Sequence, residues 1–580
     1  MLETAGLEPE EALLAGWRER AERARAHLLW PLPGTRARVH ARGVSLAVAA
    51  PCDQLYVATE VNEWALCATL AAREPARWSG LEPLLLEAAL DNAADPASVI
   101  PPVLEERAAF ERFARLAGAE ALPALRSLLA AAAARELPYV LDDETLTLGT
   151  GAGGRDFALA DLPAPQAVAW HELRGVPTAL VTGSNGKTTT ARLLAACARQ
   201  RGWHAALSST DGVFLDAAAL AAGDYSGPAG ARKVLREVRA QAAVIETARG
   251  GILRRGIAVS SADAAIVTNV SADHFGEYGV DDLEALADVK LTVAAVLGAR
   301  GLLVLNADDP LLRRRAARLG ERFGREPTLG WFALEDDSPP LAAHREGGGA
   351  TCGVRDGRLR LCAAGAVHDL GAVAAMPLTV DASATYNIAN LAAAALGAAA
   401  LGIAPATIAA VFARFGNDPG DNPGRLMRFE LDGVQLLIDY AHNPDGLRGL
   451  LAVAAHVGAG RGRLGLILGH AGNRQDADIE ALAAVAAAAH PQLIVVKENE
   501  AHLRGREPGE VPRLLRAALL RAGIAAAALP QCPSELEAVR RALEWARPGD
   551  VLALPVHSAA ARAAVLELLS ARSARYSRSR

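Results

Sequence analysis

Val181-Thr182-Gly183-Ser184-Asn185-Gly186-Lys187-Thr188-Thr189-Thr190 is the stretch that decides the fold. It follows the apolar run 177–181 and continues into residues 191–197, an order that predicts a buried strand, a glycine-bearing turn and the start of a helix. Backbone N–H groups at such a turn, together with the helix N-terminus, form a cradle for phosphate. We expect Lys187 to reach the β- and γ-phosphates of a nucleotide and the Thr188 hydroxyl to ligate Mg²⁺.

The spacing of this loop departs from the general phosphate-loop pattern. That pattern wants a glycine five residues before Gly186, where Val181 stands, so Gly183 supplies the turn from a closer position. The alternative is a Gly/Asn turn that caps an ordinary helix. We favour nucleotide binding, because Gly-Lys-Thr-Thr rarely opens a helix in this way without phosphate.

Composition narrows the class of protein. With 580 residues the chain is too long for one compact core, so we expect two to four domains. A hydrophobic content of 51% and a charged content of 22% are typical of a soluble globular protein. The net charge of -6 is spread along the chain without a long basic block, which argues against a nucleic-acid partner.

Cysteine usage and hydropathy predict a cytoplasmic protein. The six cysteines are scattered, without a Cys-x-x-Cys pair or zinc-like His spacing, which suits reduced thiols. The N-terminus is acidic from Glu3 onward and lacks a basic-then-apolar signal. Residues 382–413 carry no charge, but they are mostly Ala and Gly and are interrupted by Pro405. We therefore expect a buried helix pair there and no membrane partner.

The order of strand and helix signals predicts an α/β protein with three domains. Residues 1–160 form an α+β N-terminal domain, residues 161–171 a Pro-containing linker, and residues 172–423 a P-loop-type central domain with a mostly parallel sheet. Residues 424–580 form a smaller, Rossmann-like C-terminal α/β domain. The following segments are the expected strands after the phosphate loop: 243–246, 264–269, 301–306, 435–440, 464–469, 493–498 and 551–555.

Polar side chains follow two of these strands in the central domain. Glu246 ends one strand, and Asn269, Asp273 and His274 follow the next. The carboxyl ends of parallel strands are where open α/β sheets place their sites, and a carboxylate opposite the phosphate loop suits a metal. Any one of these residues alone is commonly a helix cap or a surface residue. Their conjunction with Lys187 and Thr188 predicts a phosphate–metal site.

These residues carry a resemblance to the Mur ligase superfamily, over about residues 172 to 560. The motifs occur in the family's order and at its spacing: 183–189, Glu246, 269–274, Lys290, Asn306-Ala307-Asp308-Asp309-Pro310, Asn422-Pro423-Gly424-Arg425 and Asp439-Tyr440-Ala441-His442-Asn443-Pro444. Within the superfamily the chain most resembles the Mur-ligase-like half of the cyanophycin synthetases. Three segments are similar to that branch: 224–228, 246–254 and Leu503-Arg504-Gly505-Arg506.

The resemblance implies an ATP- and Mg²⁺-dependent amide ligase. In this family a carboxylate attacks the γ-phosphate of ATP, and an amine displaces phosphate from the acyl phosphate that results. The implied catalytic residues are Lys187, His274 and Lys290, and the implied metal ligands are Thr188, Glu246 and His274. Lys290 matches a lysine that several members carbamylate, and the alternative is a plain lysine on a helix surface. The implied cofactor-binding residues are Gly183, Ser184, Asn185, Gly186, Lys187, Thr188, Thr189, Asn306, Asn387, Arg425 and Asp439.

The amino acid to be added is expected to bind the last domain. The resemblance implies these substrate-binding residues: Arg249, His442, Asn443, Glu498 and Arg504. Arginine is the amino acid added in cyanophycin synthetases, to an aspartate side-chain carboxylate. Glu498 or Glu500 suits a guanidinium and Arg504 suits a carboxylate, although residues 497–506 can also be read as a solvated charge run. Asn473 stands where the family has an aspartate, which puts the family's substrate in doubt.

A module of the cyanophycin synthetases is missing from this order. Their ATP-grasp module would follow a segment that 136–149 resembles, yet the phosphate loop arrives about forty residues later, too few for such a fold. We therefore expect ligation at one kind of carboxylate of a peptide-like acceptor, with a separate ATP-grasp protein as a candidate partner and homo-oligomerisation left open. The alternatives are a non-ligating nucleotide-binding partner of such an enzyme and a phosphate-loop ATPase switch.

Overall fold

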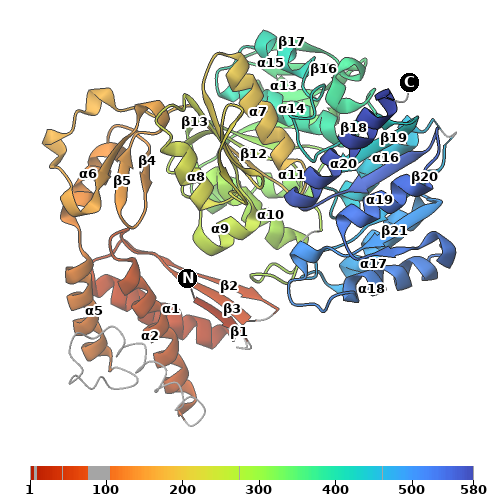
Figure 1. Ribbon diagram of the computed structural model, residues 1–580. Coiled ribbons are helices and arrows are strands. Elements are labelled where there is room, and N and C mark those ends of the chain that lie inside the picture. The colour runs from red at the N-terminus through yellow and green to blue at the C-terminus, as the bar shows by residue number, and fades with distance from the viewer. Residues whose placement is uncertain are drawn as a thin grey trace. The chain divides into compact units, whose positions relative to one another are not determined.

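The computed structural model describes residues 2–5, 10–41, 43–75, 105–272, 275–459 and 462–578. The chain divides into two compact units (Figure 1). The first unit comprises residues 1–136, 157–169 and 276–281, and the second comprises residues 137–156, 170–275 and 282–580. The domain boundaries predicted at residues 160, 171 and 423 stay predictions.

The first unit is an α+β structure around a small antiparallel sheet with the order β1-β3-β2. Trp17 and Val61 are buried between the helices, and the Trp17 indole donates to Asn62 Oδ1 at 2.9 Å. The elements of this unit are β1 (Leu2–Ala5), α1 (Glu11–His27), β2 (Thr35–His40), β3 (Gly43–Val48), α2 (Leu55–Arg73), α5 (Glu106–Glu120) and α6 (Pro123–Ala133). A separate short sheet has the order β4-β5-β6, with β4 (Tyr139–Leu141) and β5 (Thr145–Leu148) in the second unit, and with β6 (Arg155–Ala158) at the change from the second unit to the first.

An 11-stranded sheet dominates the described part of the second unit, with the order β10-β9-β8-β11-β7-β12-β13-β14-β15-β16-β17. Strands β8 to β15 in that order are parallel, and the pairs at both edges are antiparallel. The strands are β7 (Thr178–Thr182), β8 (Ala205–Ser209), β9 (Gly212–Leu215), β10 (Ala218–Ala222), β11 (Ala242–Glu246), β12 (Ala262–Val267), β13 (Leu297–Asn306), β14 (Thr328–Glu335), β15 (Ala350–Arg355), β16 (Arg358–Ala363) and β17 (Ala366–Ala372). The predicted mostly parallel sheet is confirmed, and the antiparallel edges are additions that the sequence analysis does not anticipate.

The phosphate loop lies where the strand order reverses. From β7 the chain passes to β8 and β11 on one side and then to β12 and β13 on the other. In open α/β sheets such a reversal leaves a crevice beyond the carboxyl ends of the strands. The loop after β7 therefore lies at the standard ligand-binding place of this architecture.

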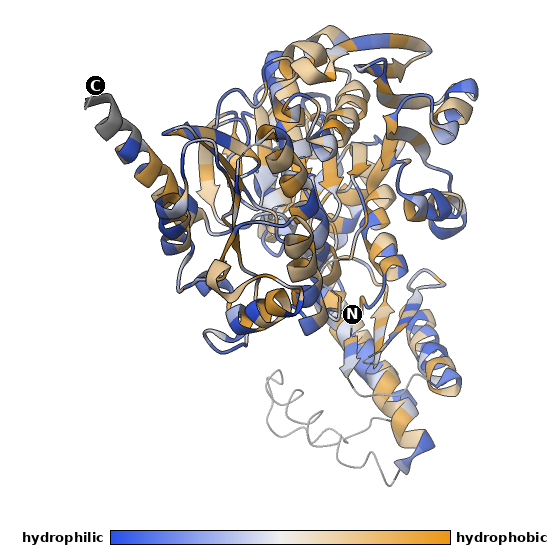
Figure 2. Ribbon diagram, turned by 90° about the vertical axis from the view of Figure 1, so that its right-hand side faces the viewer, coloured by the Kyte–Doolittle hydropathy of each residue, from blue (hydrophilic) through white to orange (hydrophobic). Residues whose placement is uncertain are grey.

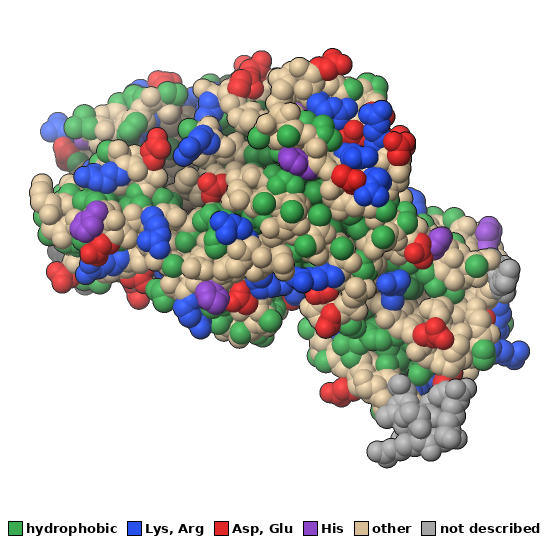
Figure 3. All heavy atoms as spheres, turned by 90° about the horizontal axis from the view of Figure 1, so that it is seen from above, with side chains coloured by type: hydrophobic (Ala, Val, Ile, Leu, Met, Phe, Trp, Pro, Cys, Tyr) green, Lys and Arg blue, Asp and Glu red, His purple; other side chains and the backbone are tan. Residues whose placement is uncertain are grey.

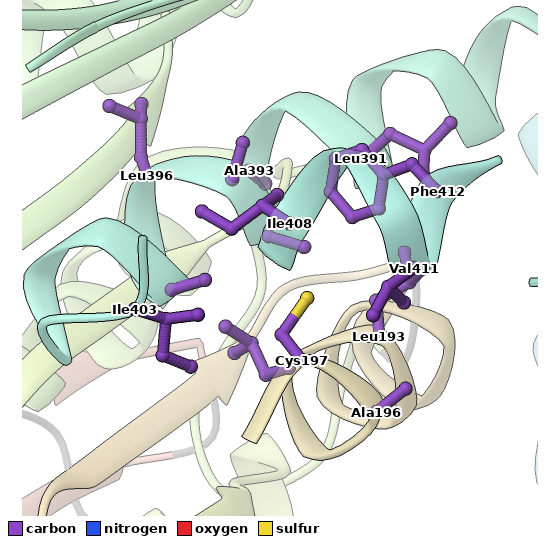
Figure 4. Packing of buried hydrophobic residues seen from close by; sticks show 14 of the residues in the cluster. Leu193, Ala196, Cys197, Leu391, Ala393, Leu396, Ile403, Ile408, Val411 and Phe412 are labelled. Carbon is purple, nitrogen blue, oxygen red and sulfur yellow. The ribbon is translucent and has the colours of Figure 1, made fainter. Parts of the chain in front are cut away.

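Helices cover both faces of this sheet (Figure 1). On one face α7 packs with α14 and α15, where Cys197, Leu391 and Ile408 meet in a buried apolar cluster (Figure 4). The predicted uncharged helix pair is thus confirmed as a buried pair broken before Pro405. The helices are α7 (Lys187–Gln200), α8 (Pro228–Leu235), α9 (Arg249–Arg255), α10 (Leu283–Leu291), α11 (Pro310–Ala316), α12 (Leu319–Phe323), α13 (Pro339–Glu346), α14 (Thr385–Ala400) and α15 (Pro405–Phe412).

A second, smaller sheet follows in the order β18-β19-β23-β20-β21-β22, in which only β18 is antiparallel to its neighbour. Its strands are apolar and pack against apolar residues of the helices, whose ribbons carry both hydrophobic and hydrophilic residues (Figure 2). The elements are β18 (Met427–Leu431), β19 (Val434–Asp439), α16 (Pro444–Val457), β20 (Leu464–Leu468), α17 (Asp476–Ala488), β21 (Leu493–Lys497), α18 (Glu510–Arg521), β22 (Gln531–Cys532), α19 (Glu535–Trp545), β23 (Val551–Pro555) and α20 (Ala559–Arg578). The four predicted strands match β19, β20, β21 and β23.

Surface charge and helix length agree with the composition. On the face shown in Figure 3, basic and acidic side chains are interspersed. No single helix of the described residues has the length and apolarity to cross a membrane. The bent pair α5 and α6, which meet at 71°, passes by length and composition alone.

Candidate nucleotide and metal site

The phosphate loop is held in shape by two glycines and a lysine. Gly183 and Gly186 have φ angles of +149° and +83°, and a Cβ on them would lie 1.8 Å from Thr268 Oγ1 and 2.1 Å from Asn390 Oδ1. Glycine is therefore required at both positions. The Lys187 ammonium donates to the carbonyls of residues 183 and 184 at 3.0 Å each, which folds the side chain over the loop. The first N–H groups of α7 face the same place and lack intrahelical partners.

Glu246 lies opposite the loop at the end of β11. Thr188 Oγ1 donates to Glu246 Oε2 at 2.9 Å, and Glu246 Oε1 is buried without a hydrogen-bond partner. Burial raises the pKa of this carboxyl, while Lys187 and the Thr188 hydroxyl act to lower it. A buried carboxylate with one oxygen unpartnered is costly in isolation, and a cation at that oxygen removes the cost.

The segment after β12 fixes the loop from the other side. Asn269 accepts the Ser184 N–H through its backbone carbonyl at 3.0 Å and the Asn185 N–H through its side-chain oxygen at 2.9 Å. Ser184 Oγ donates to the Ser271 carbonyl at 3.0 Å. Asp273 and His274, predicted to follow here, lie outside the described residues. The role of His274 as a metal ligand stays a prediction.

The predicted adenine and lysine positions are placed as follows. Asn306 ends β13, and its Nδ2 donates to the Thr268 carbonyl after β12 at 3.1 Å. Asn387 is buried in α14, and its amide donates to the Leu378 carbonyl at 3.0 Å. Lys290 is 3% exposed in the last turn of α10, so it is not a surface lysine. Its carbamylation stays a prediction.

The smaller sheet presents its own motif to the phosphate loop. Asn443 Nδ2 donates to Asn185 Oδ1 at 2.9 Å, while its side-chain oxygen caps α16 by accepting the Gly446 N–H. This contact joins the motif after β19 to the loop after β7. Their residues belong to the same compact unit as the loop.

Arg425 and Asp439 lie close together in this motif. The Arg425 guanidinium lies 4.1 Å from the centre of the Tyr440 ring, a cation–π contact. Asp439 accepts the backbone N–H groups of Leu426 and Ala441 at 2.7 Å each. Burial raises the pKa of Asp439, and Arg425 is the strongest influence that lowers it. His442 lies beside Tyr440 with its ring edge-on.

The other predicted substrate residues lie in two places. Arg249 is buried at the start of α9, directly after the Glu246 strand. Glu498 follows β21, and its carboxylate accepts the N–H groups of Asn499 and Gly509, which closes the intervening loop. Arg504 is exposed on that loop and donates to Asn473 Oδ1 at 3.3 Å. Arg249 thus follows the strand that ends at Glu246, whereas Glu498 and Arg504 lie on a separate loop of the smaller sheet.

Two residues at the site were missed in the sequence. Asn422 Nδ2 donates to Thr189 Oγ1 at 3.1 Å, although Asn422 stood in a quoted motif. Asp211 follows β8 and contacts arginines from two helices. Its signal was similar to that of Glu246: a carboxylate at the carboxyl end of a strand, in Thr210-Asp211-Gly212.

These residues fit ATP and Mg²⁺. The glycine cradle and Lys187 suit the phosphates, and Thr188 with Glu246 suits one Mg²⁺, which in nucleotide sites keeps few protein ligands. No group of three or more His, Cys, Asp or Glu side chains that would form a larger metal site gathers within the described ranges. The described residues thus form a candidate phosphate site with one candidate metal position, at Thr188 and Glu246.

Comparison with known proteins identifies a family of enzymes that use ATP. Residues 181–398 match the Mur ligase middle domain, and residues 424–554 match the Mur ligase glutamate ligase domain. The chain therefore belongs to the Mur ligase superfamily, whose members are ATP-dependent ligases that form carbon–nitrogen bonds.

Individual relatives refine this placement. The cyanophycin synthetase of Synechocystis sp. is 34% identical over 59% of this chain and 38% of its own length, so the match spans well under half of that relative. The UDP-N-acetylmuramoyl-L-alanyl-D-glutamate--2,6-diaminopimelate ligase of Parasynechococcus marenigrum is 29% identical over 69% of this chain and 75% of its own length. The folylpolyglutamate synthase of Mycobacterium tuberculosis, complexed with ADP, shares the fold at a TM-score of 0.50 and 17% identity, over 68% of this chain and 90% of its own.

Proposed function

We propose that the chain joins an amino acid to a carboxylate of a peptide-like acceptor, using ATP and Mg²⁺. The observation that carries the proposal is the Thr188–Glu246 contact beside the glycine cradle, with Glu246 Oε1 buried and unpartnered. It supports a bound cation next to the nucleotide phosphates, which phosphoryl transfer requires.

The proposed reaction has two steps. An acceptor carboxylate oxygen attacks the γ-phosphorus of ATP, the bond to the β-phosphate oxygen breaks, and an acyl phosphate and ADP form. The amine nitrogen then attacks the acyl carbon, phosphate leaves, and one proton is released. In the first step two anions must meet, so positive charge has to be supplied. Lys187 and Arg425 would supply this charge, and Mg²⁺ held by Thr188 and Glu246 would neutralise the phosphates further.

The donor is proposed to bind the loop after β21. The Glu498 carboxylate already accepts two backbone N–H groups of that loop. We therefore propose Glu500 as the carboxylate that binds a cationic side chain of the donor. Glu500 is exposed, and its pKa is raised by partial burial first and then by the carboxylates of Glu535 and Glu498. A cationic ligand would relieve this crowding of like charges.

Arg504 supplies the complementary charge on the same loop. Its partner Asn473 is a neutral amide, so that hydrogen bond leaves the guanidinium charge available to a carboxylate. Glu500 would bind the cationic end of the donor, and Arg504 would bind its α-carboxylate. Together these two residues support free arginine as the added amino acid. The similarity to cyanophycin synthetases points the same way.

The test is phosphate release from ATP with Mg²⁺, pooled amino acids and aspartate-rich peptides, followed by mass analysis of the products. We expect release to need both an acceptor and one amino acid, with the matching gain in mass. Release that needs neither would contradict the ligase and favour an ATPase. Binding of ATP without any substrate-dependent release would favour a nucleotide-binding partner of a separate enzyme.

The donor loop is tested with two variants and a control. Glu500→Gln and Arg504→Ala should each raise the KM for the amino acid about tenfold or more, with the KM for ATP unchanged. Glu507→Gln, an exposed carboxylate on the same loop, should leave both constants unchanged. Equal effects of all three variants would place the donor elsewhere.

A further inference from the structure

Asp211 is surrounded by three arginines from different parts of the second unit. Asp211 Oδ2 accepts from Arg192 of α7 at 3.1 Å, and Oδ1 accepts from Arg562 of α20 at 3.2 Å. Burial alone would raise the pKa of Asp211, but the guanidiniums of Arg425, Arg192 and Arg562 hold it below its ordinary value. Arg425 is the strongest of the three influences. The negative charge of Asp211 thus offsets the mutual repulsion of the three guanidinium groups.

Arg562 also supports the backbone that carries Arg425. Gly424 has a φ angle of +72°, and a Cβ placed on it would lie 2.4 Å from Arg562 Nη1. The Arg562 guanidinium therefore lies directly against the residue that precedes Arg425. Arg562 is buried, and it lies beyond the residues that match the Mur ligase domains. Its side chain links the last helix, the connecting segment and the loop after β8.

The net charge of this cluster favours an anionic neighbour. Besides Asp211, two carboxylates act on these arginines: Glu246 acts on Arg192 and Arg425, and Asp439 acts on Arg425. Arg192 Nε is buried without a hydrogen-bond partner. Lys187, which acts on Glu246, is the fourth cation against three carboxylates, so nucleotide phosphates would balance the remaining positive charge.

We propose that Asp211 and Arg562 are positioning residues that hold Arg425 in place beside the nucleotide phosphates. Asp211 attracts the Arg425 guanidinium, and Arg562 fixes the Gly424 backbone from behind. The Tyr440 ring supports the other side of the guanidinium. The Arg562–Asp211 contact joins α20 to the loop after β8, beside the Asn443–Asn185 contact that joins the same two sheets. This inference rests on the proposed ligase function only for its catalytic readout.

The experiment compares Asp211→Asn, Arg562→Ala, Arg562→Lys and the double variant Asp211→Asn/Arg562→Ala. We expect kcat to fall on the order of tenfold in each alanine or asparagine variant, since a charge-assisted hydrogen bond near the phosphates is lost. The lysine variant should recover part of the loss. The double variant should be no worse than the worse single one, because the two residues share one contact. Arg521→Ala, which removes the exposed pair with Glu480, is the matched control.

A second readout does not depend on catalysis. Labels on α8 and α17 allow the distribution of distances between them to be measured by energy transfer, with and without ADP and Mg²⁺. This distribution should become broader in Asp211→Asn and in Arg562→Ala. In Arg521→Ala it should stay as in the parent protein. The proposal would be overturned if both the distances and kcat stayed unchanged in the single variants. It would also be overturned if the fold-decreases in kcat of the two single variants multiplied in the double variant. If no ligase activity is found in any form, the distance measurement still decides between these outcomes.

Discussion

Thr188 Oγ1 and Glu246 Oε2 lie 2.9 Å apart, although 58 residues separate them in the chain. The contact exists because β7 and β11 are neighbours in the parallel sheet, so that the loop after one strand faces the last residue of the other. A hydroxyl and a carboxylate joined in this way form half of a cation site.

Lys187→Ala should reduce turnover at least about 10²-fold, because the charge that faces the transferred phosphate is lost. The measurement is ATP- and substrate-dependent phosphate release. Arg201→Ala, an exposed residue at the end of the same helix, is the control. Full activity in the Lys187 variant would contradict the nucleotide assignment.

Glu246→Gln should separate metal binding from stability. Burial raises the pKa of Glu246, so the stability contributed by this group is present below its unfolded pKa of about 4.5 and is lost as pH rises through the folded value. At neutral pH without ligands, the free energy of unfolding of the variant should therefore be about 1 kcal/mol higher than that of the parent protein. The Mg²⁺ concentration needed for half-maximal activity should rise at least about tenfold.

The measurements for Glu246→Gln are thermal unfolding with and without ATP and Mg²⁺, and a Mg²⁺ titration of activity. The variant should lose most of the stabilisation that ATP and Mg²⁺ give the parent protein. An unchanged Mg²⁺ requirement would remove Glu246 from the metal site.

His557 should make the protein sensitive to acid. Lys497, which is fully buried, forms an ion pair with Glu535 and lies 3.3 Å from His557 Nδ1, while His557 Nε2 donates to the Ala441 carbonyl at 3.1 Å. Burial first, and then Lys497, lower the pKa of His557 to about 4. The unfolded chain therefore binds more protons than the folded one below about pH 6.5.

Stability from this group is present above pH 6.5 and is lost as pH falls toward 4, by on the order of 2 kcal/mol at pH 4.5. Denaturant unfolding across this range measures it. His557→Gln should reduce the change in the free energy of unfolding with pH by that amount. His171 is exposed, so His171→Gln should leave this change as it is in the parent protein. Equal slopes in the parent and the His557 variant would refute the assignment.

Ala382→Gly should stabilise the fold. Val380, Asp381 and Ala382 have φ angles of +49°, +52° and +66°, a left-handed run without glycine just before α14. Left-handed geometry costs a residue with a Cβ about 1 kcal/mol, and glycine avoids that cost. Ala399→Gly, at a right-handed position within α14, should instead destabilise by about 1 kcal/mol. Denaturant unfolding of the two variants should therefore shift in opposite directions.

The sequence by itself determined the strand–loop–helix unit at 178–200, the parallel strands that follow and the family. These depend on local patterns: apolar runs of strand length, glycines at turns, and motifs whose order is kept. It also predicted the buried pair α14 and α15, because an uncharged Ala-rich segment broken at Pro405 packs best inside a fold.

Only the tertiary structure decided which distant side chains meet. That Glu246 Oε1 is unpartnered, that Asn443 contacts Asn185, and that Asp211 gathers arginines from α7 and α20 depend on strand order and helix packing. The antiparallel edges of the large sheet were equally hidden, because short hairpin strands carry the same local signals whether or not they join a sheet. Contacts between residues far apart in sequence follow from the three-dimensional arrangement, which no local pattern encodes.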